Sequence, residues 1–251
     1  MPTKNLAIFA DPVFDLADSR ITNKWPSNQV PASAMASVFS STLERAAMDT
    51  NLINEAGSAL PRLPFTLDEA RGIQSVVKEG ESYSGLGFDA SIANAESAHL
   101  EQYQVVHFAT HALLDDKHPE FSGLVLSLYG KNGEPVNGYL KLEDIYKLRL
   151  PAELVVLSAC QTALGMDTPG EGLIGLTRGF MSAGAKRVVA SLWRVDDFGT
   201  AELMKHFYRA MFVDKQSPAA ALRTAQLAMR RSKAWRDPYY WAGFIIQGEW
   251  R

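Results

Sequence analysis

The sequence has little cysteine, since its 251 residues include one. A single thiol cannot form a disulfide within the chain, which excludes a disulfide-stapled secreted domain and a zinc module built from several cysteines. No run of 18 apolar residues is present, and the first residues lack the long apolar segment of a signal peptide. We therefore expect a cytoplasmic protein that does not associate with membranes.

The net charge is also small, because the sequence has 25 Lys and Arg residues and 28 Asp and Glu residues, for a net charge of -3. This balance provides no basic surface for nucleic acid, so no direct nucleic-acid partner is expected. Apolar residues make up 47% of the chain, enough for a sizeable core. The length and composition predict a single domain over residues 1–251, in which residues 13–60 are less regular, with a helix near 34–47.

The order of apolar runs predicts an α/β fold. Strands are predicted at 6–10, 103–109, 124–127, 154–158, 187–192 and 243–247. Helical spacing predicts helices that start near 66 and cover 92–100, 172–182, 203–211 and 218–229. The strand–helix–strand unit over 154–192 favours parallel pairing. We predict a three-layer fold with a mainly parallel central sheet flanked by helices.

Side chains that could take part in catalysis follow three of the predicted strands. His111 follows the strand that ends at residue 109, Cys160 follows the strand that ends at 158, and Asp196 follows the strand that ends at 192. Carboxyl ends of parallel strands meet at one edge of a sheet, so we expect these residues to converge. A histidine near a cysteine lowers the pKa of the thiol and makes it a nucleophile. The alternative is a buried cysteine that only fills the core.

Six segments, in order along the chain, resemble those of CHAT domains, which are caspase-like peptidase domains often attached to TPR repeats. They are His107-Phe-Ala-Thr-His111, Ser122-Gly-Leu-Val-Leu-Ser127, Leu157-Ser-Ala-Cys-Gln-Thr162, Gly170-Glu-Gly-Leu173, Ser191-Leu-Trp-Arg-Val-Asp-Asp197 and Pro238-Tyr-Tyr-Trp-Ala-Gly-Phe244. Residues 10–14 and 60–64 also fit, so the resemblance covers nearly the whole chain. It implies a caspase-like fold and a Cys–His endopeptidase. Caspases place their histidine about 50 residues before the cysteine, and the spacing here is 49.

The resemblance also implies roles for individual residues. Cys160 would attack a peptide carbonyl, His111 would move the proton, and the backbone amides of Ala112 and Cys160 would hold the oxyanion. The family commonly has glycine where this chain has Ala112. That departure leaves open a non-catalytic caspase-like scaffold in a regulated signalling assembly, and a cysteine enzyme acting on small molecules is a third hypothesis.

The implied partners are a protein substrate and a TPR-containing or other regulatory protein, without a metal or organic cofactor. Asp196, Asp197 and Glu171 are candidate substrate-binding residues, because a carboxylate in a pocket would favour Lys or Arg before the scissile bond. We favour Asp196, which lies closest to its strand end, although it could instead cap the following helix. His107 is expected to be a core histidine without a catalytic role. Residues 115–122 and 165–170 are candidate gating loops.

Overall fold

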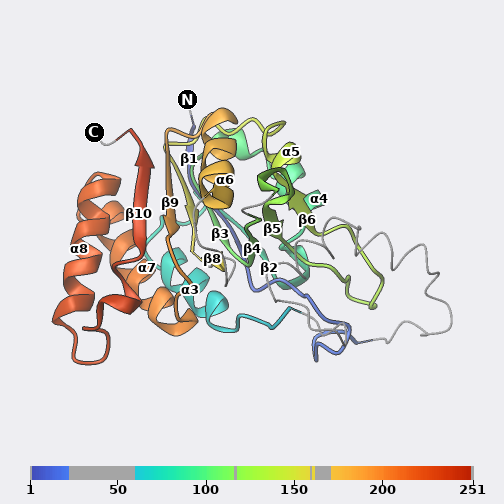
Figure 1. Cartoon of the computed structure of the whole chain (residues 1–251), viewed down its shortest axis with the longest axis horizontal. Helices are drawn as coiled ribbons and strands as arrows, with labels where there is room; N and C mark the ends of the chain where they lie inside the picture. The colour runs from blue at the N-terminus through green and yellow to red at the C-terminus, as the bar shows by residue number, and fades with distance from the viewer. Residues whose placement is uncertain (1, 23–59, 116–117, 159, 162–170, 250–251) are drawn as a thin grey trace.

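The computed structural model describes residues 2–22, 60–115, 118–158, 160–161 and 171–249. Its main sheet has six strands in the order β10-β9-β7-β3-β1-β2 (Figure 1). Their bounds are β1 Lys4–Ala10, β2 Ser82–Leu86, β3 Tyr103–Ala109, β7 Leu154–Leu157, β9 Arg187–Ser191 and β10 Phe244–Gly248. All neighbours pair in parallel except β10, which runs antiparallel to β9 at one edge. The mainly parallel sheet predicted from the sequence is confirmed.

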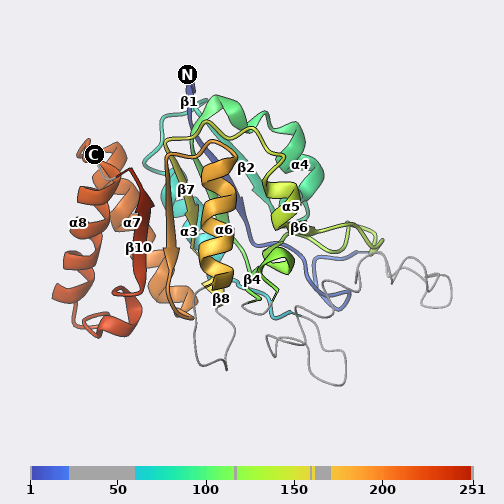
Figure 2. The same cartoon turned by 45° about the horizontal axis from the view of Figure 1, so that its top comes forward.

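Helices cover both faces of this sheet (Figures 1 and 2). One face packs on α3 (Phe65–Gln74), α7 (Asp197–Phe212) and α8 (Pro218–Arg231), and the other on α4 (Ile92–Ser97), α5 (Leu142–Ile145) and α6 (Glu171–Ser182). Side chains of a strand alternate between faces, so Ile8 of β1 joins the first core and Phe9 joins the second. The predicted three-layer arrangement is confirmed.

A second, smaller sheet stands beside the main one and was not predicted. Its order is β6-β5-β4-β8, with bounds β4 Ala112–Leu113, β5 Gly123–Val125, β6 Tyr139–Lys141 and β8 Cys160–Gln161. The apolar run at 124–127 therefore supplies a strand of this sheet and not of the central one. The chain passes from the main sheet into the small one twice, from β3 into β4 and from β7 into β8.

Short elements complete the described structure. Single 3-10 turns lie at Gly87–Asp89, Leu100–Gln102, Pro119–Phe121 and Pro238–Tyr240. The helix predicted over 92–100 ends early because His99 has a left-handed backbone, with φ 52°, which an α-helix cannot continue through. The predicted helix at 34–47 and the predicted loop at 165–170 lie outside the described residues. Within the described residues, no helix combines the length and apolar character needed to cross a bilayer.

Candidate functional site

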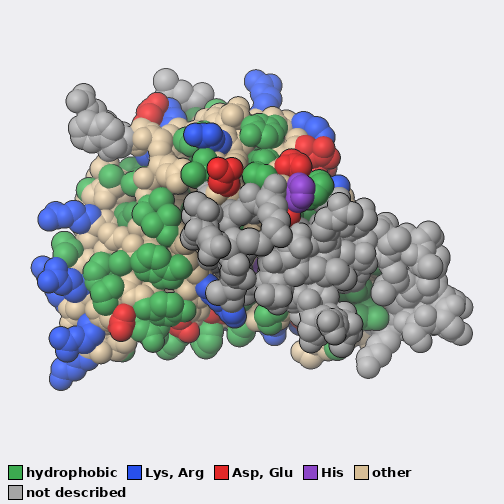
Figure 3. All heavy atoms as spheres, in the orientation of Figure 1, with side chains coloured by type: hydrophobic (Ala, Val, Ile, Leu, Met, Phe, Trp, Pro, Cys, Tyr) green, Lys and Arg blue, Asp and Glu red, His purple; other side chains and the backbone are tan. Residues whose placement is uncertain are grey.

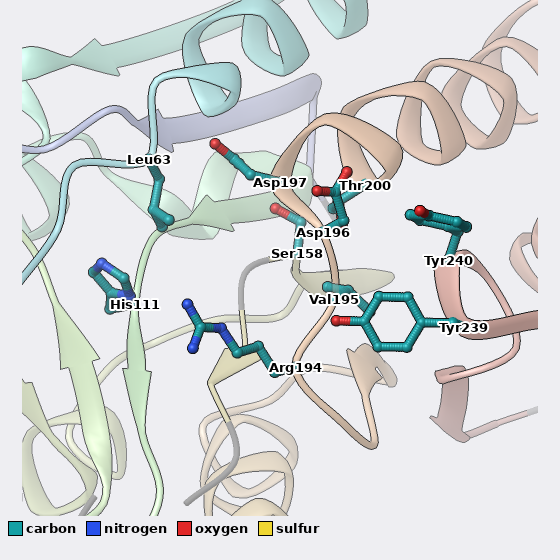
Figure 4. A pocket seen from close by; sticks show the side chains of 10 residues that line it. All are labelled: Leu63, His111, Ser158, Arg194, Val195, Asp196, Asp197, Thr200, Tyr239 and Tyr240. Atoms are coloured by element: carbon teal, nitrogen blue, oxygen red, sulfur yellow. The ribbon is translucent and has the colours of Figure 1, made fainter. Parts of the chain in front are cut away.

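The three chemically interesting strand ends do converge. Strands β9, β7 and β3 are neighbours and parallel, and the Ser158 amide donates to the Phe108 carbonyl at 3.1 Å just past the end of β7. A cavity of about 500 Å³ opens beside these ends (Figure 4). Ten residues from five parts of the chain line it: Leu63, His111, Ser158, Arg194, Val195, Asp196, Asp197, Thr200, Tyr239 and Tyr240. His111, Ser158 and the residues from Arg194 to Asp197 thus follow the ends of parallel strands, where α/β folds place ligands.

His111 lies at the cavity with one ring nitrogen bonded and the other free. Its Nε2 is 2.7 Å from the Pro61 carbonyl oxygen. A carbonyl can only accept, so Nε2 carries the hydrogen and Nδ1 of the neutral ring is unprotonated. Nδ1 is buried and has no hydrogen-bond partner among the described residues. The ring also packs on Phe14, with centroids 4.9 Å apart. This arrangement leaves one basic nitrogen available.

The surroundings keep this imidazole neutral. Burial lowers the pKa of His111 to about 4, the positive charge of Arg194 lowers it further, and the bond to Pro61 opposes both. Charging a buried imidazole costs its hydration, which explains why burial is the largest cause. At neutral pH the ring is therefore unprotonated, and the lone pair of its Nδ1 is free to accept a hydrogen bond.

Cys160 is the first residue of β8 (Cys160–Gln161), and the structure describes the position of its backbone. In the parallel pairing of β4 with β8, Cys160 stands opposite Ala112, the residue after His111. Neighbouring strands lie about 4.8 Å apart, so these two backbones are adjacent. The side chain of Cys160 lies outside the described part of the chain. The catalytic roles of His111 and Cys160, and the oxyanion role of the Ala112 and Cys160 amides, stay predictions.

Asp196 has a structural role that the sequence offered as an alternative. Its Oδ2 accepts a hydrogen bond from the Gly199 amide at 2.7 Å, which caps the N-terminus of α7. The residue still lines the cavity. Glu171, in contrast, is the exposed first residue of α6 and is not among the residues lining the cavity.

Asp197 is the more unusual carboxylate. Its Oδ2 accepts from the Phe65 amide at 3.0 Å, which joins α7 to the start of α3. Burial raises its pKa to about 6, nearby carboxylates including Glu69 add to the rise, and the Phe65 bond opposes it. A carboxylate that is costly to charge and opens onto a cavity favours a cationic occupant.

A buried polar group lies behind the cavity. His107 places Nδ1 2.8 Å from the Tyr208 hydroxyl, and Nε2 3.1 Å from Ser158 Oγ and 2.9 Å from Glu69 Oε1. All four residues are fully buried. His107 is therefore a core histidine with partners, as predicted, and it fixes Ser158 at the cavity wall.

Several lining residues were not predicted as part of the site. Thr200 follows Asp196 by one helical turn, which places both at the same end of α7. Its hydroxyl is buried and has no hydrogen-bond partner among the described residues. Tyr239 and Tyr240 belong to the segment at 238–244 that resembles the family, and Arg194 lies between the end of β9 and the cap of α7. For Arg194, Tyr239 and Tyr240 the one available signal was their position in segments that resemble the family, and for Thr200 there was none.

Among the residues that the structure describes, no three His, Cys, Asp or Glu side chains are grouped so that they could hold a metal ion.

Comparisons with known proteins give a consistent result. The family model described as "CHAT domain" matches residues 3–249. Tetratricopeptide repeat protein 28 is 37% identical over 109 residues in Mus musculus and 36% identical over 109 residues in Homo sapiens. Each match covers 43% of this chain and 4% of the relative, so the chain spans a small part of those proteins.

Two solved structures of very low sequence identity are also similar. The Arg specific cysteine proteinase gingipain R is 9% identical, with a TM-score of 0.47, over 84% of this chain and 51% of the other. The complex of the Porphyromonas gingivalis RgpB pro- and mature domains is 10% identical, with a TM-score of 0.48, over 99% of this chain and 47% of the other.

Proposed function

Because this chain belongs to the CHAT domain family, we propose that it is a cysteine endopeptidase that cleaves protein substrates with Cys160 and His111. The observation that carries the proposal is the pairing of β8 with β4. It brings the backbone of Cys160 next to the segment that begins at His111, whose free Nδ1 is buried at the cavity.

The proposed mechanism is acyl transfer. His111 Nδ1 takes the thiol proton, and the Cys160 sulfur forms a bond to the scissile carbonyl carbon. The negative charge that develops on the carbonyl oxygen is stabilised by the backbone amides of Ala112 and Cys160. The imidazolium then donates its proton to the leaving amine as the C–N bond breaks. Water hydrolyses the thioester with the same histidine as base.

The cavity would hold a Lys or Arg side chain of the substrate. Asp197 supports this specificity because its carboxylate is half-buried, beside a cavity, and among other carboxylates. Asp196 contributes a second negative charge, and the Thr200 hydroxyl offers an unused hydrogen-bonding group. Of the three predicted substrate-binding acids, Glu171 would act only on a part of the substrate outside this cavity.

A single cysteine makes the central test unambiguous, since any thiol reagent reports on Cys160. The rate of alkylation is measured from pH 5 to pH 9 in the wild type and in His111→Gln. We expect a thiol that reacts well below pH 8 in the wild type, and a profile that shifts toward the ordinary thiol pKa of about 8.5 in the variant. An inert thiol with no dependence on His111 would contradict the proposal.

Cleavage is tested in parallel with peptide-acyl probes that vary the residue before the reactive carbonyl. Labelling of the wild type by Lys and Arg probes, and its loss in Cys160→Ala, is the expected result. Cleavage of proteins that persists in Cys160→Ala would overturn it.

The second candidate function is a non-catalytic module in a regulated assembly. Ala112, in place of the family's usual glycine, favours it, because a Cβ next to the oxyanion position narrows the approach of a substrate. The named relative suggests a TPR-containing partner for either function. We also propose a cytoplasmic location, on the basis of the low cysteine content alone. Thiol reactivity decides between the two functions.

A further inference from the structure

The Pro61 carbonyl that holds His111 belongs to a segment fastened to the end of β1 by charged groups. This segment, residues 60–64, contains Pro61 and Pro64, which have no amide hydrogen to donate. Two of its five residues therefore offer no backbone donor. The guanidinium of Arg62 supplies an attachment and reaches across to Asp11, the residue after β1.

The contact between Arg62 and Asp11 is a two-point ion pair. Arg62 Nε donates to Asp11 Oδ1 and Nη2 donates to Oδ2, both at 2.8 Å. The Asp11 side chain is 3% exposed. Two parallel hydrogen bonds between a guanidinium and a buried carboxylate fix direction as well as distance. The pair therefore holds Arg62, the residue after Pro61, to the end of β1.

Asp11 is itself held firmly. Its backbone is left-handed, with φ 53°, an uncommon conformation for a residue with a side chain. Arg20 donates to the carbonyl oxygen and to Oδ2 of Asp11, both at 2.8 Å. The Asp11 amide donates to Thr66 Oγ1 at 3.0 Å. Thr66 Oγ1 in turn donates to the Leu63 carbonyl at 2.7 Å. Residues 60–66 are thus tied to the end of β1 at two points.

The same strand end is next to His111. In the register of β1 with β3, Ala10 pairs with Ala109, so Asp11 and His111 follow neighbouring strands at one edge. From these contacts we infer that the Arg62–Asp11 ion pair positions His111. The ion pair holds the Pro61 carbonyl beside Nε2 of the imidazole, and this carbonyl selects the tautomer in which Nδ1 carries no hydrogen. The inference rests on the proposed function for its catalytic meaning, but the effect on the tautomer does not depend on activity.

The test compares Arg62→Gln and Arg62→Lys with the wild type in the full chain. Long-range proton–nitrogen NMR reports which nitrogen of each histidine carries the hydrogen, and the spectrum of His111→Gln identifies the His111 signal among the five histidines. In Arg62→Gln we expect a mixture of tautomers and a fall in the Cys160 alkylation rate on the order of 10- to 100-fold, the cost of misplacing a reacting group by about 1 Å. Arg62→Lys, which keeps the charge, should restore part of both.

Arg149→Gln is the matched control, because Arg149 is an exposed arginine far along the chain from this cluster. A His111 that stays in a single Nε2–H tautomer in Arg62→Gln, with an alkylation rate within twofold of the wild type, would overturn the inference. Should Arg62→Gln fail to fold, Arg62→Lys decides alone, through the same two readouts. A thiol that is inert in the wild type while the tautomer still responds to Arg62 would refute the proposed function and leave the positioning role standing.

Discussion

The charge of Asp197 is expected to cost folding stability, and replacing it with asparagine should recover that cost. The pKa of this carboxyl rises from an ordinary value of 3.8 to about 6 on folding. In a fully buried site such a rise corresponds to roughly 3 kcal/mol at neutral pH. Solvent screens a half-buried group, so we expect about 1–2 kcal/mol. Asparagine can still accept the hydrogen bond from the Phe65 amide through its carbonyl oxygen.

The pH dependence gives the prediction its sign. Between pH 4 and pH 6 the folded protein keeps a proton on Asp197 that the unfolded chain has released, so this group lowers the free energy of unfolding as pH rises. Asp197→Asn has no such titration. The variant should therefore match the wild type near pH 4 and exceed its stability by about 1–2 kcal/mol at pH 7.5.

Urea denaturation at both pH values measures the difference, with Asp214→Asn as a control on an exposed carboxylate beyond α7. A stability difference that is equal at the two pH values would refute the reasoning. In the same variant, labelling by Lys and Arg probes should fall although the protein is more stable. A loss of probe labelling together with a gain in stability is expected of a residue that serves ligand binding at a cost to folding.

Three further variants test other parts of the site. His107→Ala should lower the free energy of unfolding by about 3–5 kcal/mol, measured in urea, because it leaves the buried polar atoms of Glu69, Ser158 and Tyr208 without their histidine partner. Asp196→Ala should cost about 1 kcal/mol through loss of the α7 cap, whereas Asp196→Asn should cost little, and thermal melts distinguish the two. His111→Gln should flatten the loss of stability between pH 6.5 and pH 4, where the unfolded histidine binds a proton and the buried one, with its pKa of about 4, does not.

The sequence predicted the main sheet well because its strands are buried on both faces. The run at 154–157 is continuously apolar and fully buried, and the run at 103–109 is interrupted only by Gln104 and His107. Such runs are typical of strands that helices cover on both faces. Strand β2 was missed, since Ser82–Leu86 has polar residues and glycine and gains its place only by pairing with β1. The small sheet was missed for a related reason. Two-residue strands such as β4 carry no periodicity that a sequence could show.

The candidate site divides in the same way. His111 and Cys160 were proposed from their positions after strands, and the pairing of β4 with β8 does place these two segments of backbone side by side. Asp196 was favoured over Asp197 as the specificity residue because it is closer in sequence to the strand end. In the structure α7 begins at Asp197, so the Asp196 side chain accepts the Gly199 amide as the N-cap of this helix. The Pro61 carbonyl could not be foreseen, since every residue offers a carbonyl and only the tertiary fold selects one.

The double passage from the large sheet to the small one has a mechanical consequence. His111 lies between the end of β3 and the start of β4. Cys160 is the first residue of β8, which follows β7, and β7 is the neighbour of β3 in the large sheet. Backbone pairing on both sides of this junction, including the Val125 amide on the His111 carbonyl at 2.9 Å, therefore sets the separation of the two chains. Core substitutions that weaken the fold should change how long the site survives, while leaving its dimensions unchanged for as long as the molecule is folded.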